Sequence, residues 1–353
     1  MFETVPFVRS GTLPFWKAIG ENTASVVVQF HPSIVGDTMS TTMTGSSSKG
    51  IMFHHFRGEN QPKAQGSISA EQFGQMIDLV QSNSTILSPS EYLQLAQQNL
   101  LKDHHTCLTF DDALQSQIKI ALPVLDSFNI QGFFFVYSSA FLGNPDPLEI
   151  YRYFRTNHYT DFEPFFADFM SITQQLFGEQ VKKSLYGFQP SVYLANAPFY
   201  SDNERTFRFL RDNVFVHDQY DTIMNLLMSE LKFNRSDVMG KLFMSIADIQ
   251  LLQRTGHEVG LHSHGHPTTM HKLDKQSQQI EYQTNYDFLK KNLGVNPQTM
   301  SHPNGNYSAD TLDILREMGI LLGFRATMSP PMAPSVLEIP REDHSNLLSK
   351  IST

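Results

Sequence analysis

The chain has 353 residues, of which 40% are hydrophobic and 17% charged, and its formal net charge is -9 at pH 7. This composition is typical of an ordered soluble protein with one large core or two smaller ones, and the negative charge argues against a nucleic-acid partner because no basic field would attract phosphates. The single cysteine, Cys107, excludes an intrachain disulfide and a zinc site built from several thiolates.

Residues 1–50 are expected to form an N-terminal extension with a flexible linker. Residues 37–50 are almost all Ser, Thr, Gly and Met, which is typical of a linker, whereas residues 24–29 could form a short strand. Prolines and charged residues interrupt the start of the chain, so we expect no signal peptide, and no apolar run approaches the ~18 residues of a membrane span. These features predict a cytoplasmic protein.

Short apolar runs alternate with amphipathic stretches from residue 51 onward. The pattern predicts strands over residues 51–53, 107–110, 132–137, 258–261 and 320–326. It predicts a helix that begins at Ser69, and further helices over residues 88–100, 114–128, 246–254, 276–293 and 309–318. Such alternation predicts parallel strands joined by crossover helices, and the number of units favours a (β/α) barrel over an open sheet.

Residues 143–244 interrupt this alternation. They are rich in Phe, Tyr, Met and Asn, with helical patterns near residues 161–178, 202–212 and 219–232. We therefore expect a long helical insertion or lid within a barrel that otherwise spans residues 51–353.

Two adjacent carboxylates, Asp111 and Asp112, follow directly after the strand expected over residues 107–110. Two carboxylates at a strand end are not both comfortably ionised unless a cation or solvent separates them. A divalent metal on one of them would leave the other free to accept a proton from water. The alternative is that the pair caps the helix that follows, since Asp is a favoured N-cap residue.

Three histidines, His262, His264 and His266, occupy alternate positions after the strand expected over residues 258–261. If a turn follows that strand, the four-residue spacing brings the outer two imidazoles to one side, as in other zinc motifs. His264 is expected to support the site rather than bind metal. The alternative is a cluster of surface histidines. In parallel barrels catalytic groups lie at the carboxyl ends of strands, where the aspartates and His262 are expected.

Three further segments could face the same site. Pro303 and Gly305 fix a loop whose amides could stabilise an oxyanion, or they form an ordinary turn before the next helix. His344 could protonate a leaving amine, or it lies in a solvated polar loop. His54 and His55 follow the first strand, so one of them could border the site, or the two are half-buried structural residues.

In this order, the segments resemble the polysaccharide deacetylases of carbohydrate esterase family 4, the NodB-homology group. The first family motif, Thr-Phe-Asp-Asp followed by a small residue, matches residues 109–113, and the second, His-Ser/Thr-x-x-His, matches residues 262–266. The third motif is usually Arg-x-Pro-x-Gly followed closely by Tyr. Residues 301–307 match it except that Ser301 stands in place of the Arg. The Trp-containing fourth motif is not recognisable, because the only tryptophan is Trp16.

The resemblance implies a distorted (β/α) barrel that removes acetyl groups from N-acetylated sugars with a divalent metal, often zinc. It implies Asp111 as the general base. The metal ligands that it implies are Asp112, His262 and His266. It also implies an oxyanion contact from an amide near Asn304 and a general acid, for which His344 is the nearest candidate. We further expect Tyr307 and His54 to contact the substrate or the oxyanion.

The sequence therefore predicts a metal-dependent hydrolase that removes an N-acetyl group from a carbohydrate or sugar derivative, in surface-glycan biosynthesis. Two alternatives remain. An O-acetyl esterase or a deformylase could use the same scaffold, because the same water attacks each carbonyl. A glycan-binding pseudoenzyme is favoured by the missing Arg and the missing fourth motif, and it is opposed by the intact aspartate and histidine pairs.

Overall fold

The structure is a computed structural model that describes residues 48–61, 66–195 and 200–351. The N-terminal extension, including the strand expected over residues 24–29, lies outside the described residues. Among the helices of the described segments, none is both long and apolar enough to cross a membrane.

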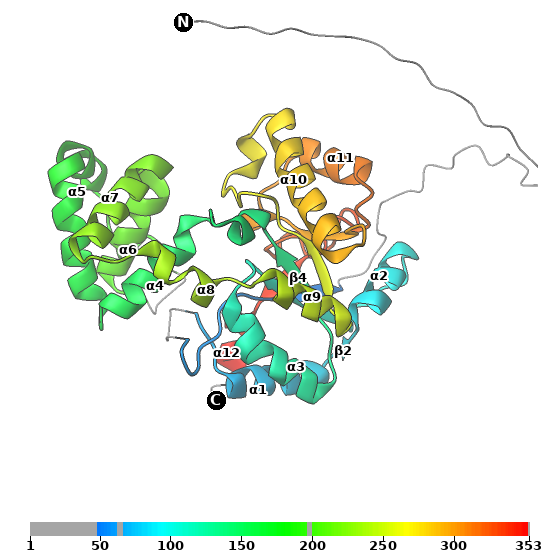
Figure 1. The fold of residues 1–353 in the computed structure, drawn as a ribbon. Helices are drawn as coiled ribbons and strands as arrows, with labels where there is room; N and C mark the ends of the chain where they lie inside the picture. Colours follow the sequence, from blue (N-terminus) through cyan, green and yellow to red (C-terminus); the bar gives the residue numbers. More distant parts are fainter. Residues whose placement is uncertain (1–47, 62–65, 196–199, 352–353) are drawn as a thin grey trace, which may run out of the picture. The chain divides into compact units, whose positions relative to one another are not determined.

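A parallel sheet of eight strands forms the centre of the described chain (Figure 1). Its strands are β1 (Lys49–Phe53), β2 (Thr85–Ile86), β3 (His105–Asp111), β4 (Phe133–Val136), β5 (Glu258–Leu261), β6 (Thr299–Ser301), β7 (Leu322–Phe324) and β8 (Arg341–Asp343). Their order is β7-β6-β5-β4-β3-β1-β8, and β2 pairs with the start of β3. The first strand begins at Lys49, within the segment expected to be linker.

The segment that leads into β8 closes this sheet into a barrel. Ile339 pairs with Phe324 of β7, where its backbone N–H donates to the Gly323 carbonyl over 2.9 Å. Beyond it, Gly50 of β1 donates to the Pro340 carbonyl, and β8 continues along β1 in parallel register. One stretch of chain thus joins the two outer strands, and the predicted distorted (β/α) barrel is confirmed.

The helices that surround the barrel are α1 (Ala70–Gln81), α2 (Pro89–Gln97), α3 (Leu122–Phe128), α9 (Ile246–Arg254), α10 (Lys275–Leu293), α11 (Ala309–Glu317) and α12 (His344–Ile351). Local signals start and stop several of them. Ser69 begins α1 with a capping box, in which its hydroxyl accepts from the Gln72 N–H and the Gln72 side chain accepts from the Ser69 N–H. Gly294 ends α10 in the left-handed conformation, with φ 74°, which costs glycine little.

The helix expected over residues 114–128 forms only in part. A π-helical turn covers Gln117–Ala121, and regular α3 begins at Leu122. The Gln117 amide donates to the backbone carbonyls of His54, over 3.0 Å, and Asp111, over 2.6 Å. This side chain therefore ties the ends of β1 and β3 together, a long-range contact that helical periodicity does not contain.

Between β4 and β5 the chain forms a group of helices, which are α4 (Pro147–His158), α5 (Phe162–Leu185), α6 (Asp202–Phe209), α7 (His217–Glu230) and α8 (Met239–Leu242). They pack around their own aromatic cluster, which includes Phe154, Phe165, Phe169 and Phe207. Leu114 and Tyr137, which follow β3 and β4, join the same cluster, so these helices are anchored to strand ends.

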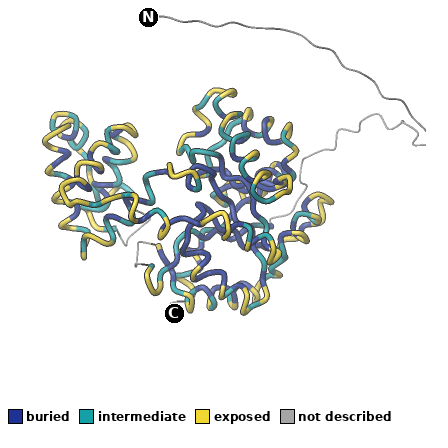
Figure 2. Tube along the Cα trace, in the orientation of Figure 1, coloured by how far each residue is buried: buried dark blue, intermediate teal, exposed yellow. Residues whose placement is uncertain are grey.

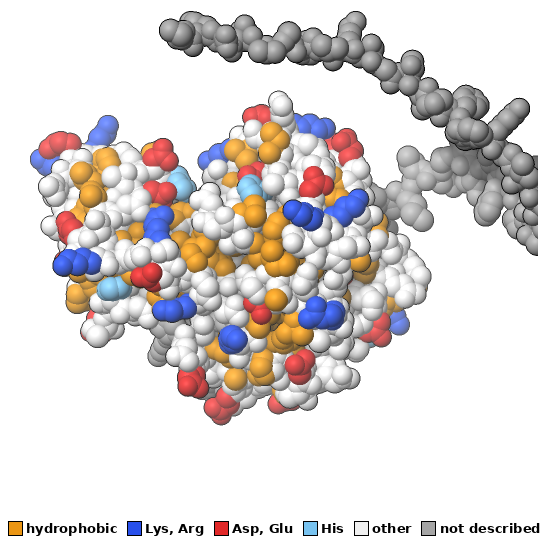
Figure 3. All heavy atoms as spheres, in the orientation of Figure 1, with side chains coloured by type: hydrophobic (Ala, Val, Ile, Leu, Met, Phe, Trp, Pro, Cys, Tyr) orange, Lys and Arg blue, Asp and Glu red, His pale blue; other side chains and the backbone are white. Residues whose placement is uncertain are grey.

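Buried residues follow the strands and the inner faces of the helices, whereas exposed positions lie on outer turns (Figure 2). Alternation along the strands separates two layers of core. Phe134 and Val136 face the surrounding helices, and Phe133 and Phe135 pack with Cys107 and other residues in a second cluster. On the face drawn in Figure 3, acidic and basic side chains are scattered among one another.

Candidate active site

The candidate site lies at the carboxyl ends of the strands, where β3 supplies both aspartates. Because side chains alternate along a strand, Asp111 shares the face of Cys107 and Thr109. The next residue would point the other way in a regular strand. Asp112 instead has a φ of 77°, and this left-handed turn brings both carboxylates within 3.9 Å of the His54 ring nitrogen Nε2. Non-glycine residues with such a φ are costly and cluster at functional sites.

Asp111 is held by an arginine that sequence reasoning did not single out. The Arg341 guanidinium, on β8, donates from Nη1 to Asp111 Oδ1 over 2.8 Å and from Nη2 to Oδ2 over 2.7 Å. The Ser301 hydroxyl accepts from Arg341 Nη2 and donates to Asp111 Oδ2. The guanidinium and the carboxylate are almost wholly buried. Such a two-pronged pair fixes the orientation of the carboxylate as well as its charge.

Asp112, His262 and His266 converge into one cluster. Asp112 Oδ1 lies 3.3 Å from His262 Nε2 and 3.4 Å from His266 Nε2, and the three prospective ligand atoms are all within 4.8 Å of one another. Asp112 Oδ1 is buried without a hydrogen-bond donor of acceptable geometry. One carboxylate oxygen that faces two imidazole nitrogens without being satisfied by them fits a divalent cation.

The outer nitrogens of both histidines are held by other parts of the chain. His262 Nδ1 lies 2.8 Å from the Ser301 carbonyl, to which it donates, and His266 Nδ1 lies 2.8 Å from Asp146 Oδ2. With each Nδ1 bonded to these oxygens, each Nε2 is directed at Asp112, which is the position that a metal ligand requires. Asp146 is the N-cap residue of α4, so the inserted helices contribute to the site. His264, which is expected to support the site rather than bind metal, has its Nδ1 2.8 Å from the Ser138 hydroxyl.

Burial and the neighbouring charges shift the pKa values of Asp112 and His266. Burial acts to raise the pKa of Asp112, but the neighbouring His262, His54 and His266 hold it well below its ordinary value. Burial acts to lower the pKa of His266, whereas the bond to Asp146 and the charge of Asp112 raise it, with a net result of about 9. Without a metal, the cluster therefore holds a proton that a cation would displace.

Asp111 has a low pKa for a different reason. Burial acts to raise the pKa of its carboxyl, and Arg341, with a smaller effect from His262, brings it below the ordinary value. Burial also lowers the pKa of His54 although both aspartates act to raise it. Asp111 is thus ionised and His54 neutral near pH 7, which leaves both able to accept a proton.

The two histidines considered as proton donors lie in different surroundings. His54 Nε2 is 3.9 Å from Asp111 Oδ2 and 3.8 Å from Asp112 Oδ2. His344 begins α12, where its Nε2 lies 2.9 Å from the Gly66 carbonyl and its ring stacks on Phe53. The structure therefore brings His54 to the two carboxylates and gives His344 a contact in the packing of α12. The role implied for His344 stays a prediction.

The third segment lies in the short turn Pro303–Gly305 that follows β6. Asn304 is exposed and has a φ of 52°. Tyr307 donates from its hydroxyl to Glu338 Oε1 over 2.9 Å, and its ring stacks on His302. These contacts hold Tyr307 in the wall beside the turn, and the oxyanion role of the Asn304 amide stays a prediction.

A model of the polysaccharide deacetylase family matches residues 238–323. Over these residues the chain is similar to the polysaccharide deacetylases. The match spans β5, both histidines of the prospective metal cluster and the turn after β6, so the resemblance predicted from the motifs is confirmed. No match was found among curated proteins.

The chain also matches solved structures, of which two are described here. The Streptococcus pyogenes deacetylase PplD in complex with acetate is 14% identical, with a TM-score of 0.48, over 86% of this chain and 97% of that one. IcaB from Ammonifex degensii is 15% identical, with a TM-score of 0.47, over 89% of this chain and 100% of that one.

Three residues of the site were not assigned from the sequence. Arg341 and Asp146 act across the fold on Asp111 and His266, and Ser301 joins Arg341 to Asp111. One signal was present for Ser301, which occupies the position of the family's Arg. Its hydroxyl contacts the Asp111 carboxylate, while a guanidinium reaches the same carboxylate from Arg341 on β8.

Proposed function

We propose that this site is the catalytic centre of a metal-dependent hydrolase that removes the N-acetyl group of a carbohydrate or sugar derivative. One observation carries the proposal: Asp112, His262 and His266 converge on one point, beside a separate carboxylate, Asp111, that Arg341 holds ionised. The similarity of residues 238–323 to the polysaccharide deacetylases supports carbohydrate deacetylation as the chemistry.

Asp112, His262 and His266 would hold a divalent cation, for which zinc is our proposal. Two imidazoles and one carboxylate are a common ligand set of catalytic zinc, with further positions left for water and substrate. When bound, the ion would polarise the acyl carbonyl and lower the pKa of a water molecule.

Asp111 would act as general base and His54, rather than His344, as general acid. Asp111 takes a proton from the attacking water, but its low pKa makes it a poor place to keep that proton. His54 Nε2, 3.9 Å away, can receive the proton and deliver it to the leaving amine nitrogen. Water adds to the acyl carbon, the carbon–nitrogen bond breaks, and acetate and a free amine result. The proton that Asp111 removes ends on the amine, so the charges balance.

Two sequence features favoured a glycan-binding pseudoenzyme: the missing Arg of the third motif and the missing fourth motif. Arg341 supplies a guanidinium to Asp111 from β8, so the missing Arg no longer favours a pseudoenzyme. The surface-glycan substrate and the cytoplasmic location stay predictions.

The test combines metal content with acetate release. Protein loaded with zinc, and separately with cobalt, is incubated with N-acetylhexosamines, their O-acetyl esters and N-formyl analogues, and the released acid is measured. We expect acetate from an N-acetylated sugar. Asp111→Asn should abolish this release and retain metal, whereas His262→Ala should reduce both. Metal-loaded protein that is inert toward every amide and ester would overturn the proposal.

A further inference from the structure

The inserted helices carry a group of arginines that the proposed function does not use. Arg155 lies on α4, Arg208 lies on α6, and Arg211 lies in the π-helical turn η3 (Leu210–Val214) that continues α6. All three side chains are half-buried. Together these residues form the arginine cluster, a concentration of positive charge in a chain whose net charge is -9.

Aromatic rings join the two helical segments that carry the cluster. Arg155 Cζ lies 5.8 Å from the ring centroids of Phe162 and Phe165 on α5. Arg211 Cζ lies 5.7 Å from the ring centroid of Phe207 on α6. The Phe207 ring is itself 5.7 Å from that of Phe162 and 5.3 Å from that of Phe165. Such contacts hold a guanidinium in place without giving its N–H groups an acceptor oxygen.

Arg155 is the member of the cluster that most requires an anion. Among the described residues it has neither a hydrogen-bond acceptor nor an ion-pair partner. Burial lowers the pKa of Arg155, and the net result is about 10. Tyr220 acts to raise this pKa, whereas the positive charges of Arg152 and of the other two cluster members act to lower it. A half-buried cation that is held among like charges is unfavourable unless an anion binds beside it.

The nearby carboxylates do not neutralise the cluster. Asp212 binds Arg211, with 2.5 Å from Nε to Oδ1 and 2.9 Å from Nη2 to Oδ2. In the described part of the chain, Asp212 is the one carboxylate among the strongest charges that act on the three arginines. The described residues therefore leave the cluster positive, and a positive site favours an anionic ligand.

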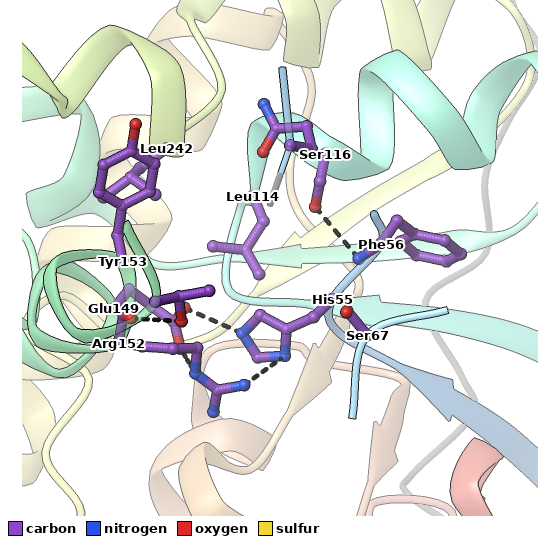
Figure 4. Close-up of a pocket in the computed structure, with 11 residues that line it drawn as sticks. His55, Phe56, Ser67, Leu114, Ser116, Glu149, Arg152, Tyr153 and Leu242 are labelled. Atoms are coloured by element: carbon purple, nitrogen blue, oxygen red, sulfur yellow. Dashed lines mark hydrogen bonds and ion pairs between the residues drawn. The ribbon is translucent and has the colours of Figure 1, made fainter. Parts of the chain in front are cut away.

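The cluster is separate from the proposed catalytic centre. Along α4, Arg152 precedes it. Its Nη1 donates to His55 Nδ1 over 3.0 Å, and its Nε lies 3.6 Å from Glu149 Oε1 (Figure 4). Arg155 lies nine positions after Asp146, whose carboxylate holds a histidine of the metal cluster, and nine residues of helix span about 13 Å. One small anion cannot contact both places.

The arrangement of donors favours a phosphate group over a carboxylate. A carboxylate has one charge on two oxygens and is matched by a single guanidinium, as Asp212 matches Arg211. A phosphate monoester has close to two charges at pH 7 and three acceptor oxygens, so guanidinium groups from two helical segments can bind it together. We propose that the arginine cluster binds the phosphate group of a phosphate monoester, with Arg155 as its principal contact.

The test measures binding to the full-length, metal-free protein in chloride buffer, so that no metal ion competes for the probes. Glucose 1-phosphate supplies the phosphate without an acetyl group, and glucuronate supplies a carboxylate on a sugar of similar size. Calorimetry measures both. We expect glucose 1-phosphate to bind at least about tenfold more tightly, because one further charge-assisted hydrogen bond is enough for that factor. Co-sedimentation with phosphatidylcholine vesicles, with and without phosphatidic acid, tests a lipid as the source of the phosphate.

Substitutions assign the binding to the cluster. Arg155→Gln should weaken glucose 1-phosphate binding at least about tenfold, and Arg155→Lys, which keeps the charge but loses the fork of donors, should weaken it less. Arg254→Gln is the matched control, because Arg254 is an exposed arginine on α9, and it should leave the affinity unchanged. Thermal unfolding checks the fold of each variant. Arg208→Gln should also weaken binding and keeps the test valid if Arg155→Gln does not fold.

The outcomes separate the source of the phosphate from the existence of the site. Binding of glucose 1-phosphate that depends on Arg155 but not on Arg254 would support a soluble ester as the ligand. Vesicle binding with the same dependence, and only with phosphatidic acid, would support the same site with a lipid as the source. Equal affinity for glucuronate, binding that Arg155→Gln leaves unchanged, or no binding of either phosphate probe would overturn the proposal. Because neither metal nor turnover is involved, its failure would leave the proposed hydrolase untouched.

Discussion

Replacing Arg341 with methionine is expected to destabilise the protein by about 3–5 kcal/mol, the usual cost of removing one partner of a buried ion pair. The Arg341 guanidinium is completely buried and the Asp111 carboxylate nearly so, with two charge-assisted hydrogen bonds between them. Methionine fills much of the space but leaves the carboxylate without its counter-charge. Since total stability of a domain is about 5–15 kcal/mol, the variant should fold with a much reduced margin.

The pH dependence of this loss is distinctive. The pKa of Asp111 in the folded protein lies below its ordinary value of 3.8, so the pair stabilises the fold above that pH. This stabilisation disappears as the pH falls through the folded pKa. In Arg341→Met the main opposition to burial is gone, and the pKa of Asp111 should rise. The variant can then relieve its buried charge by protonation. Its deficit relative to the wild-type protein should be largest near neutral pH and shrink on acidification.

The assay is urea denaturation of the metal-free protein at about pH 7 and about pH 5, with Arg341→Met, Asp111→Asn and the double variant compared in a cycle. We expect a coupling energy of at least about 2 kcal/mol at the higher pH, because the second substitution removes the charge that the first left unpaired. Catalysis gives an independent measurement. The acidic limb of the kcat/KM profile of Arg341→Met should move to higher pH, because a base with a raised pKa loses activity earlier.

Three results would refute this reasoning. A loss below about 1 kcal/mol for Arg341→Met would mean that solvent or another group satisfies Asp111. Additive effects in the cycle would mean that the two residues act independently. A deficit that grows on acidification would contradict the sign of the proposed pKa shift.

Three further predictions concern the metal and the proton path. Metal binding should release a proton near pH 7, and metal affinity should rise up to about pH 9, because the cation displaces the proton held on His266. Calorimetry in buffers of different ionisation enthalpy measures this proton release, and metal binding without proton release would contradict the prediction. Asp146→Asn should weaken metal affinity about 10–100-fold by loosening the hold on His266, as judged by competition with a chelator; unchanged affinity would show that Asp146 has only a structural role. His54→Gln should lower kcat about 10²–10⁴-fold because it removes the proposed general acid, whereas His344→Gln should alter stability more than kcat. A larger loss of kcat in His344→Gln than in His54→Gln would instead support His344 as the general acid.

Much of the fold follows from signals within a few residues. Ser69 and Ser88 begin helices because each hydroxyl can cap the backbone N–H three residues later, and Gly294 ends one because it tolerates positive φ. The short strands were harder to predict. β2, β6 and β8 each contain only two or three residues, and what makes them strands is pairing with neighbours that lie far away in the chain.

The sequence by itself determined the members of the prospective metal cluster, because Asp112, His262 and His266 lie in two compact motifs at strand ends. Only the tertiary structure decided how the site is completed. Arg341 lies 230 positions from Asp111, and the two meet because the segment at Ile339 closes the barrel and carries β8 alongside β1. Asp146 reaches His266 across 120 positions because the two residues follow β4 and β5, which are paired in the sheet. Local periodicity records which face of an element is buried, but pairing between distant strands determines which charged groups that burial brings together.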